Sequence, residues 1–159
     1  MAHCRLAIKE DAYSLAPRMR QADINEIKAS HGVKPLDALL EPFNSYYTGT
    51  AYSIISDIDD IVIGMFGSRS TDDSNYGCAW LLSSEELRTQ SHKKQFLKQC
   101  RKWVNKINKP FRYIYNYVDA RNWQSLKCLK FCGFEIITTE KYGLENIDFH
   151  LLVRDSKNV

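Results

Sequence analysis

The polar run Asp-Ala-Arg-Asn at 119–122 has the residue types and the position best suited to chemistry. It follows residues 113–118, which are aromatic and β-branched and are typical of a buried strand. Asn122 has the side chain of a helix N-cap, and apolar residues recur at helical spacing after it. Asp119 could take a proton from a substrate, or it could cap the turn and pair with Arg121. Pockets at the carboxyl ends of strands are common in α/β proteins, so this turn is a candidate site.

Other groups capable of chemistry are more scattered. Glu85 and Glu86 follow an expected strand and are further candidate bases. Cys128 and Cys132 lie one helical turn apart, but no His or further Cys stands at ligand spacing, so they are interpreted as buried structural thiols. The four histidines show no zinc spacing, and the sequence has no Walker loop, G-x-S-x-G or G-x-G-x-x-G motif. We therefore expect no metal.

The composition predicts one domain spanning residues 1–159. The chain is 44% hydrophobic and 26% charged, as in ordinary globular proteins. No apolar run approaches the roughly 20 residues that cross a bilayer, and the N-terminus lacks the apolar centre of a signal peptide. Five cysteines, an odd number, indicate reduced thiols in a cytosol-like compartment. A net charge of +3 is too mild to indicate nucleic-acid binding.

The elements that must position these groups follow from hydrophobic periodicity. Strands are expected at 4–8, 51–56, 61–67, 76–82, 113–118, 134–138 and 148–153. Helices are expected from Glu10 to 30–32 with a break near Pro17, from Pro35, over 93–106, and after Asn122. In the first helical region, the residues expected to face outward are Arg18, Arg20, Glu26 and Lys28. This mixed order predicts a central sheet with helices on both faces.

That order, with Asn122 and Ser125 after a strand and Gly133-Phe134 after a helix, resembles the GNAT acyltransferase fold. The resemblance implies a single α/β (α+β) domain with a mixed, mostly antiparallel sheet. Two central parallel strands, here 76–82 and 113–118, would splay apart and hold the pantetheine arm of acyl-coenzyme A. An open slot between the strands of Trp80 and Asn116 would favour cofactor binding. A slot filled by Tyr115 or Trp80 would favour an inert scaffold.

A closer resemblance is to a family of small GNAT-like proteins of short-tailed bacteriophages, often labelled internal virion proteins. Its members contain segments similar in sequence to LAPRMRQADINEI, AWLLSSEEL, FLKQCRKWV, NYVDARN and LKFCGFEI. The label implies a protein of the host cytoplasm during infection, or of the virion interior. Its partners would be other particle proteins or a second copy of itself.

The GNAT resemblance also implies a pyrophosphate loop, which would fall on residues 88–93. Arg88 matches the family pattern, whereas Ser91 and Lys93 stand where glycine or alanine is usual. Backbone N–H groups at a helix start attract phosphate, but Ser91 as a cap and a solvated basic face would explain the same residues. The positions implied to bind acetyl-coenzyme A are Leu82, Arg88, Ser91, His92, Lys93, Asn122 and Ser125.

The tyrosine that protonates the departing thiolate in many GNAT enzymes is replaced here by Leu129. The residues that could substitute for it are Tyr115, Tyr117, Tyr142 and Cys128. A β-bulge N–H on the 76–82 strand would polarise the thioester carbonyl, and Asp119 would serve as base. Two functions stay open: a phage particle protein with a degenerate acyl-coenzyme A site, or an active acetyl-coenzyme A-dependent N-acetyltransferase.

Overall fold

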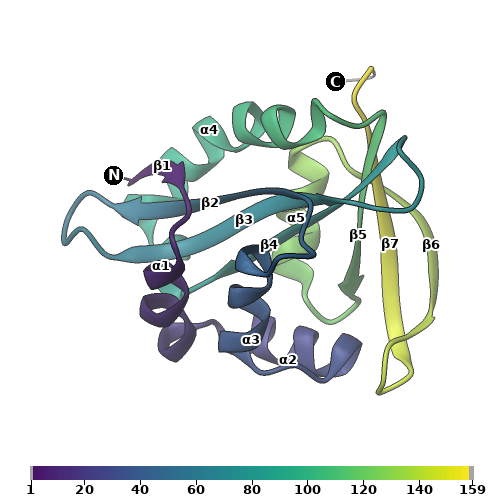
Figure 1. The fold of residues 1–159 in the computed structure, drawn as a ribbon, viewed down its shortest axis with the longest axis horizontal. Helices are drawn as coiled ribbons and strands as arrows, with labels where there is room; N and C mark the ends of the chain where they lie inside the picture. Colours follow the sequence, from purple (N-terminus) through teal and green to yellow (C-terminus); the bar gives the residue numbers. More distant parts are fainter. Residues whose placement is uncertain (1, 158–159) are drawn as a thin grey trace.

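A computed structural model describes residues 2–157, arranged as one mixed sheet between two layers of helices (Figure 1). The strands are β1 (Ala2–Leu6), β2 (Gly49–Ser56), β3 (Val62–Ser70), β4 (Tyr76–Ser83), β5 (Tyr113–Asp119), β6 (Glu135–Tyr142) and β7 (Ile147–Asp155). The α-helices are α1 (Lys9–Leu15), α2 (Gln21–His31), α3 (Pro35–Leu40), α4 (Gln90–Asn108) and α5 (Trp123–Phe131). All the strands expected from the sequence are present, each within a few residues of its expected bounds.

The sheet has the strand order β1-β2-β3-β4-β5-β7-β6. Every neighbouring pair is antiparallel except β4 and β5, which run parallel. Their pairing covers only Tyr76–Tyr113, Gly77–Ile114 and Cys78–Tyr115. Beyond these residues the two strands diverge toward their carboxyl ends, so the splayed parallel pair expected from the sequence is confirmed.

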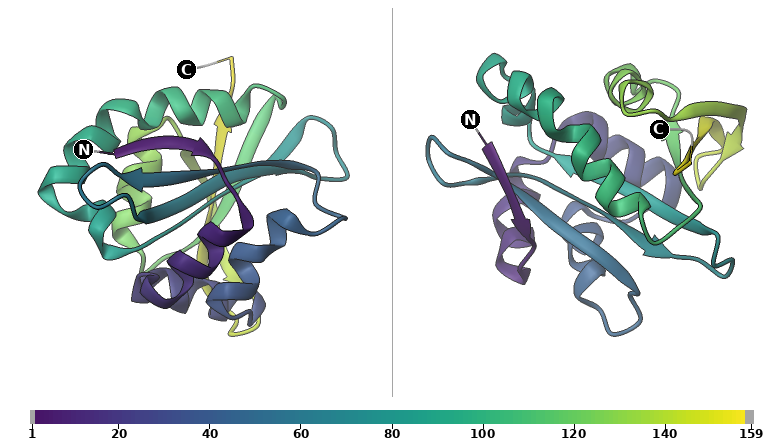
Figure 2. Two further views of the ribbon diagram at one scale, coloured as in Figure 1. Left: turned by 60° about the vertical axis from the view of Figure 1, so that its left-hand side comes forward. Right: turned by 90° about the horizontal axis from the view of Figure 1, so that it is seen from above.

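Two hydrophobic clusters hold the helices to opposite faces of the sheet. One contains Leu15 of α1 and Leu39 of α3, each fully buried. The other contains Cys100 and Ile107 of α4, with Leu129 of α5 packed against it. Figures 1 and 2 show α1 to α3 on one side of the sheet and α4 on the other. The periodic apolar face predicted for 93–106 is the face of α4 that packs on the sheet.

The proline, glycine and asparagine residues at the helix ends act as their chemistry predicts. Pro17 lies in a short 3-10 turn that separates α1 from α2. Gly32 ends α2 with a φ of 69°, and Gly133 follows α5 with a φ of 94°, conformations that glycine adopts without penalty. Asn122 caps α5, because its Oδ1 accepts the N–H of Ser125 at 3.4 Å.

The tip of the β6–β7 hairpin is fastened to the C-terminal end of α2. Leu144 N–H donates to the Ser30 carbonyl at 3.2 Å, and Glu145 N–H donates to the Ala29 carbonyl at 3.1 Å. Gly143 has a φ of 76°, and a Cβ there would come within 2.5 Å of the Ala29 oxygen. The hairpin thus needs glycine at this point to reach the helix.

Candidate functional site

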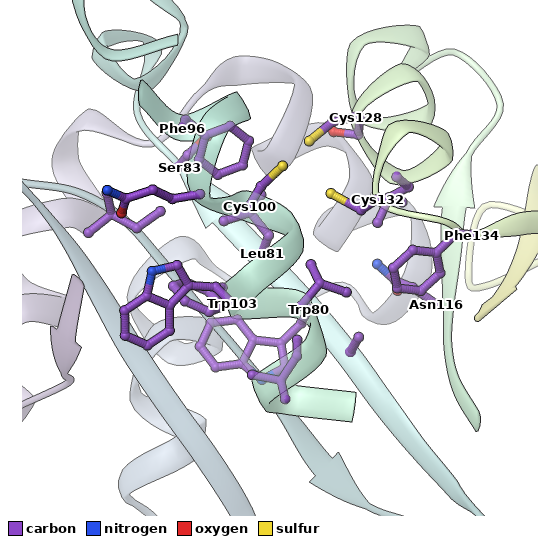
Figure 3. A pocket seen from close by; sticks show the side chains of 18 of the residues that line it. Trp80, Leu81, Ser83, Phe96, Cys100, Trp103, Asn116, Cys128, Cys132 and Phe134 are labelled. Carbon is purple, nitrogen blue, oxygen red and sulfur yellow. The ribbon is translucent and has the colours of Figure 1, made fainter. Parts of the chain in front are cut away.

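A cavity of about 100 Å³ opens between the diverging strands β4 and β5; we call it the cleft. Trp80 and Leu81 of β4 and Asn116 of β5 line it, together with side chains from α4 and α5 (Figure 3). Tyr115 is not among the residues that line it. Trp80 packs against the cluster with α1 and α3 and donates its indole N–H to Tyr47 Oη at 3.0 Å, and a cavity remains between the two strands.

The helix α2 closes the carboxyl end of the cleft, held by a buried arginine. Arg20 is only 1% exposed, and it pairs with Asp23 at 2.8 Å. Its backbone N–H donates to the Ser83 carbonyl at the end of β4, and its guanidinium reaches Gln124 of α5 at 2.6 Å. The expectation that Arg20 faces outward is wrong, because the end of β4, Asp23 of α2 and the start of α5 supply its acceptors.

Glu26 and Asp23 are the carboxylates that this arrangement brings to the cleft, and Asp23 is paired with Arg20. Glu26 has a different partner. Its Oε2 accepts a hydrogen bond from Asn122 Nδ2 at 2.8 Å. Burial raises the pKa of Glu26 to about 8, and the charges of Asp23 and Asp119 add to the rise against the opposing Asn122 hydrogen bond. The expectation that Glu26 faces outward is also wrong. The signal that could have found it is its position one helical turn after Asp23.

Asp119 and Tyr117, the catalytic residues expected from the sequence, lie apart from the cleft lining. Asp119 is 3% exposed and receives hydrogen bonds from the Arg121 backbone at 2.9 Å and guanidinium at 2.6 Å. Burial opposes its ionisation, but these bonds outweigh burial and hold its pKa below the ordinary value. Tyr117 stacks on Tyr142 with ring centroids 4.1 Å apart. Asp119 thus has a structural task in its turn.

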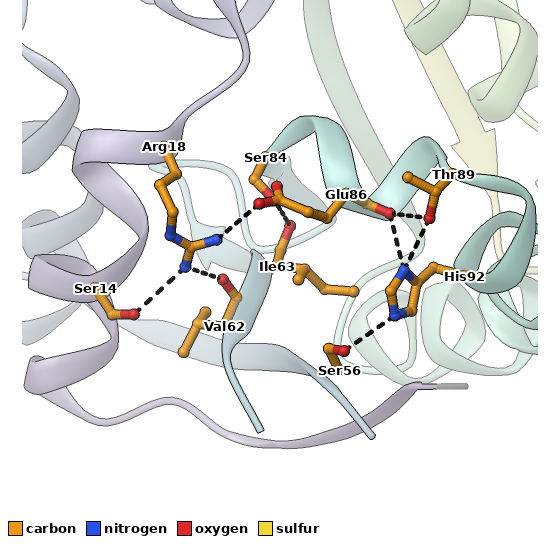
Figure 4. Close-up of polar contacts among 9 residues, drawn as sticks. All are labelled: Ser14, Arg18, Ser56, Val62, Ile63, Ser84, Glu86, Thr89 and His92. Carbon is orange, nitrogen blue, oxygen red and sulfur yellow. Dashed lines mark hydrogen bonds and ion pairs between the residues drawn. The ribbon is translucent and has the colours of Figure 1, made fainter. Parts of the chain in front are cut away.

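The side chains of Glu86 and His92 are held by contacts with Arg18 and Ser56 (Figure 4). Glu86 pairs with Arg18 at 3.5 Å, and a hydrogen bond from Ser84 is the main cause of its lowered pKa. His92 is buried, with its Nε2 3.1 Å from Ser56 Oγ. The structure therefore turns the side chain of His92 away from any phosphate at the helix start. Glu85 is exposed to solvent.

Arg88 reaches the cleft from the short turn that precedes α4. Its Nε is buried without a hydrogen-bond partner among residues 2–157. Burial lowers its pKa, and the nearby charge of Arg20 contributes. Ser91 and Lys93 are exposed in the first turn of α4. A buried guanidinium donor without an acceptor, beside a helix N-terminus, suits an anionic ligand.

The helix α5 presents one continuous face to the cleft. This face consists of Ser125, Cys128, Leu129 and Cys132, which recur at helical spacing and all line the cavity. Ser125 Oγ also accepts a 3.4 Å hydrogen bond from Arg20. Asn122 lies just behind this face, where it joins Arg20 to Glu26. Leu129 stands where the GNAT resemblance implied a tyrosine, and it lies on this face between Cys128 and Cys132.

The backbone of β4 offers hydrogen-bond donors to the cleft. Ser84 N–H donates to the Ile63 carbonyl of β3, whereas Ser83 N–H donates to Asp23 on the opposite side at 3.0 Å. Because N–H directions alternate along a strand, Leu81 N–H points into the splay and Leu82 N–H points toward β3. Leu82 packs its side chain in the cluster with α1 and α3, so the structure does not bring it to the cleft.

The β-bulge expected in residues 76–82 is absent from the described pairing. Bulges interrupt β2–β3 and β6–β7, but β3 and β4 pair without a shift from Gly64–Ser83 to Ser70–Gly77. Divergence of the strands, rather than a bulge, is what exposes the backbone of β4.

Within residues 2–157, no group of three or more His, Cys, Asp or Glu side chains could hold a metal ion. A search of the same residues finds no helix with the length and apolar character needed to cross a membrane.

No protein-family model matches the sequence, and no curated protein matches it. Solved structures match the fold. A GNAT-family acetyltransferase from Bacillus anthracis aligns with a TM-score of 0.70 and 11% identity, covering 99% of this chain and 96% of that chain. An N-acetyltransferase from Staphylococcus aureus Mu50 gives 0.70 and 18%, covering 98% and 99%. AAC(6')-Ib, solved with ribostamycin and coenzyme A, gives 0.69 and 16%, covering 98% and 94%. This chain therefore has the single-domain α/β GNAT fold.

Proposed function

We propose that the protein is an N-acyltransferase that moves an acetyl group from acetyl-coenzyme A to an amine. The observation that carries the proposal is the open cleft between β4 and β5 with Glu26 at its end. A slot for a thioester and a carboxyl group with a pKa of about 8 are what amine acylation requires at neutral pH. The coenzyme A in the neighbouring structure of AAC(6')-Ib supports the choice of donor.

The residues around the cleft fit the donor, acetyl-coenzyme A. Its pyrophosphate would meet Arg88, whose buried Nε lacks an acceptor, and the first turn of α4 with Ser91 and Lys93. Its pantetheine arm would lie along β4, where the N–H of Leu81 can stabilise negative charge on the thioester oxygen. Ser125 would add a polar contact from α5.

Glu26 would act as the base. A carboxyl group with a pKa near the working pH is ionised in part of the molecules and can still take a proton readily. Asn122 fixes the orientation of the carboxyl group, and Arg20 fixes Asn122 in turn. The attacking amine would approach from the α2 side, lose its proton to Glu26 and bond to the acetyl carbon as the bond to sulfur breaks, so that the amide and the coenzyme A thiolate leave.

The role of a phage particle protein is a second proposal. The observation that favours it is the similarity of several separate segments of the sequence to the small GNAT-like phage proteins. The solved structures that match the fold do not support it. Its partners would be other particle proteins or a second copy, in the host cytoplasm or the virion. A chain that does not bind acetyl-coenzyme A at millimolar concentration and copurifies with phage particles would favour this role.

Isothermal calorimetry with acetyl-coenzyme A, followed by an amine acetylation assay, tests the first proposal. We expect saturable binding at micromolar concentration. Glu26→Gln should keep that binding and lose at least about a hundredfold in turnover, a typical contribution of a general base. Glu85→Gln, a matched change at an exposed position, should keep both properties. Absence of binding, or full turnover in Glu26→Gln, would overturn the proposal.

A further inference from the structure

Three thiols meet inside the cleft. Cys100 comes from α4, Cys128 from α5, and Cys132 is the C-cap residue of α5, one turn after Cys128; all three line the cavity. Figure 3 shows their sulfur atoms turned toward one another across the space between the two helices. All three are free thiols. The cluster occupies the face of α5 where a proton-donating phenol was expected, so reactive groups of a different kind lie beside the donor site.

The three thiols are not equivalent. The neighbouring thiols Cys100 and Cys128 raise the pKa of Cys132. The hydrogen bond from Cys132, with the charges of Arg88 and Arg20, lowers the pKa of Cys128 although burial and Cys100 oppose this. Cys100 is 4% exposed, whereas Cys128 is partly exposed.

Cys4 provides a contrast within the same cavity. It also lines the cleft, from β1, but burial raises its pKa to about 12. A thiol with such a pKa holds its proton and is a poor nucleophile near neutral pH. Position in the cleft alone therefore does not make a cysteine reactive. The charges of Arg88 and Arg20 distinguish Cys128 from Cys4, and its partial exposure distinguishes it from the buried Cys100, whose pKa contact with Cys132 also lowers.

We propose that Cys128 is an acyl-accepting nucleophile, so that the cleft carries the acetyl group on the protein before the amine receives it. The sulfur of Cys128 bonds to the acetyl carbon, and the bond from that carbon to the coenzyme A sulfur breaks. The proton that Cys128 gives up ends on the coenzyme A thiol, so no oxidant or reductant is needed. The amine then attacks the S-acetyl group, its nitrogen bonds to the acetyl carbon as the bond to the Cys128 sulfur breaks, and the amine proton passes through Glu26 to the Cys128 thiolate, which restores the thiol.

This inference rests on the proposed function, because it requires acetyl-coenzyme A in the cleft. The test uses the full chain with acetyl-coenzyme A and no amine, quenched in acid and measured by intact mass and peptide mapping. We expect one added acetyl group, located on Cys128 and removed by hydroxylamine. Cys128→Ala should lose the added group, and Cys4→Ala should keep it. With an amine present, two-substrate kinetics should give the parallel reciprocal lines of a ping-pong mechanism.

Calorimetry on the same samples separates the two failures. Binding of acetyl-coenzyme A with an unmodified protein, an acetyl group on Cys100 or Cys132 instead, or wild-type turnover in Cys128→Ala overturns this inference and leaves the proposed function intact. No binding at all overturns the proposed function itself. Circular dichroism checks that Cys128→Ala is folded, and Cys128→Ser takes its place if it is not, with the same loss of a hydroxylamine-sensitive adduct expected.

Discussion

Replacing Glu26 with glutamine removes a carboxyl group whose ionisation the fold opposes. Burial, reinforced by Asp23 and Asp119, raises the pKa of Glu26 from 4.5 to about 8. Each pKa unit is worth about 1.4 kcal/mol, so full ionisation costs the folded state on the order of 5 kcal/mol. The folded state holds this proton more tightly than the unfolded state. The contribution of Glu26 to stability is therefore fully present below pH 4.5 and is lost as pH rises through about 8.

Glutamine should abolish this loss, because it has the shape of the protonated acid and its oxygen can still accept the hydrogen bond from Asn122. We expect Glu26→Gln to be more stable than the wild type by less than about 1 kcal/mol near pH 5, about 3 kcal/mol near pH 7, and about 5 kcal/mol near pH 9. Urea denaturation at the three pH values measures these differences. Glu85→Gln, exposed, should follow the wild type. A constant difference between Glu26→Gln and the wild type from about pH 5 to 9 would refute the raised pKa.

Three further changes test other contacts. Arg88→Ala should weaken acetyl-coenzyme A binding by about tenfold or more in calorimetry, since it removes a cationic donor; unchanged affinity would contradict the placement of the pyrophosphate. Asp119→Asn should cost about 1 kcal/mol in urea near pH 7 and nothing well below pH 3.8, because the pKa of Asp119 is depressed; turnover should stay unchanged, and a large loss would return Asp119 as the base. Gly143→Ala should cost more than about 1 kcal/mol, with a clash at Ala29, and raise KM for the amine; an unchanged melting temperature would argue against it.

The architecture was predictable because local chemistry and the overall fold agree. The aromatic and β-branched residues of β5 predict a strand, Asn122 predicts the start of α5, and Gly133 predicts its end. The structure has all three. The apolar stripe of α4 likewise predicted which face packs on the sheet. The ends of strands were less predictable, because pairing with neighbours, rather than composition, extends β3 to Ser70 and β7 to Asp155.

The site was less predictable because its decisive contacts join distant segments. Glu26 and Arg20 look like surface residues in a helical pattern, and only the docking of α2 across the ends of β4 and β5 buries them. Asp119, by contrast, makes the local contact with Arg121 that the sequence offered as the alternative to a base. Cys100 lies 28 residues before Cys128, and no spacing rule predicts that their sulfurs share a cavity. Charge, burial and contact at these positions are properties of the assembled sheet.

The helix α2 lies outside the splayed strands, yet it carries Glu26, the residue that we propose as the base. The contacts proposed for the acyl donor come from β4, α4 and α5, whereas Glu26 comes from the stretch between β1 and β2. The proposed donor site and the proposed base therefore belong to separate, contiguous segments of the chain. A chimera that exchanges only residues 9–43 would change the base and the amine side while leaving the donor slot as it is. Acceptor preference in this fold can thus diverge by segment exchange, without rebuilding the sheet.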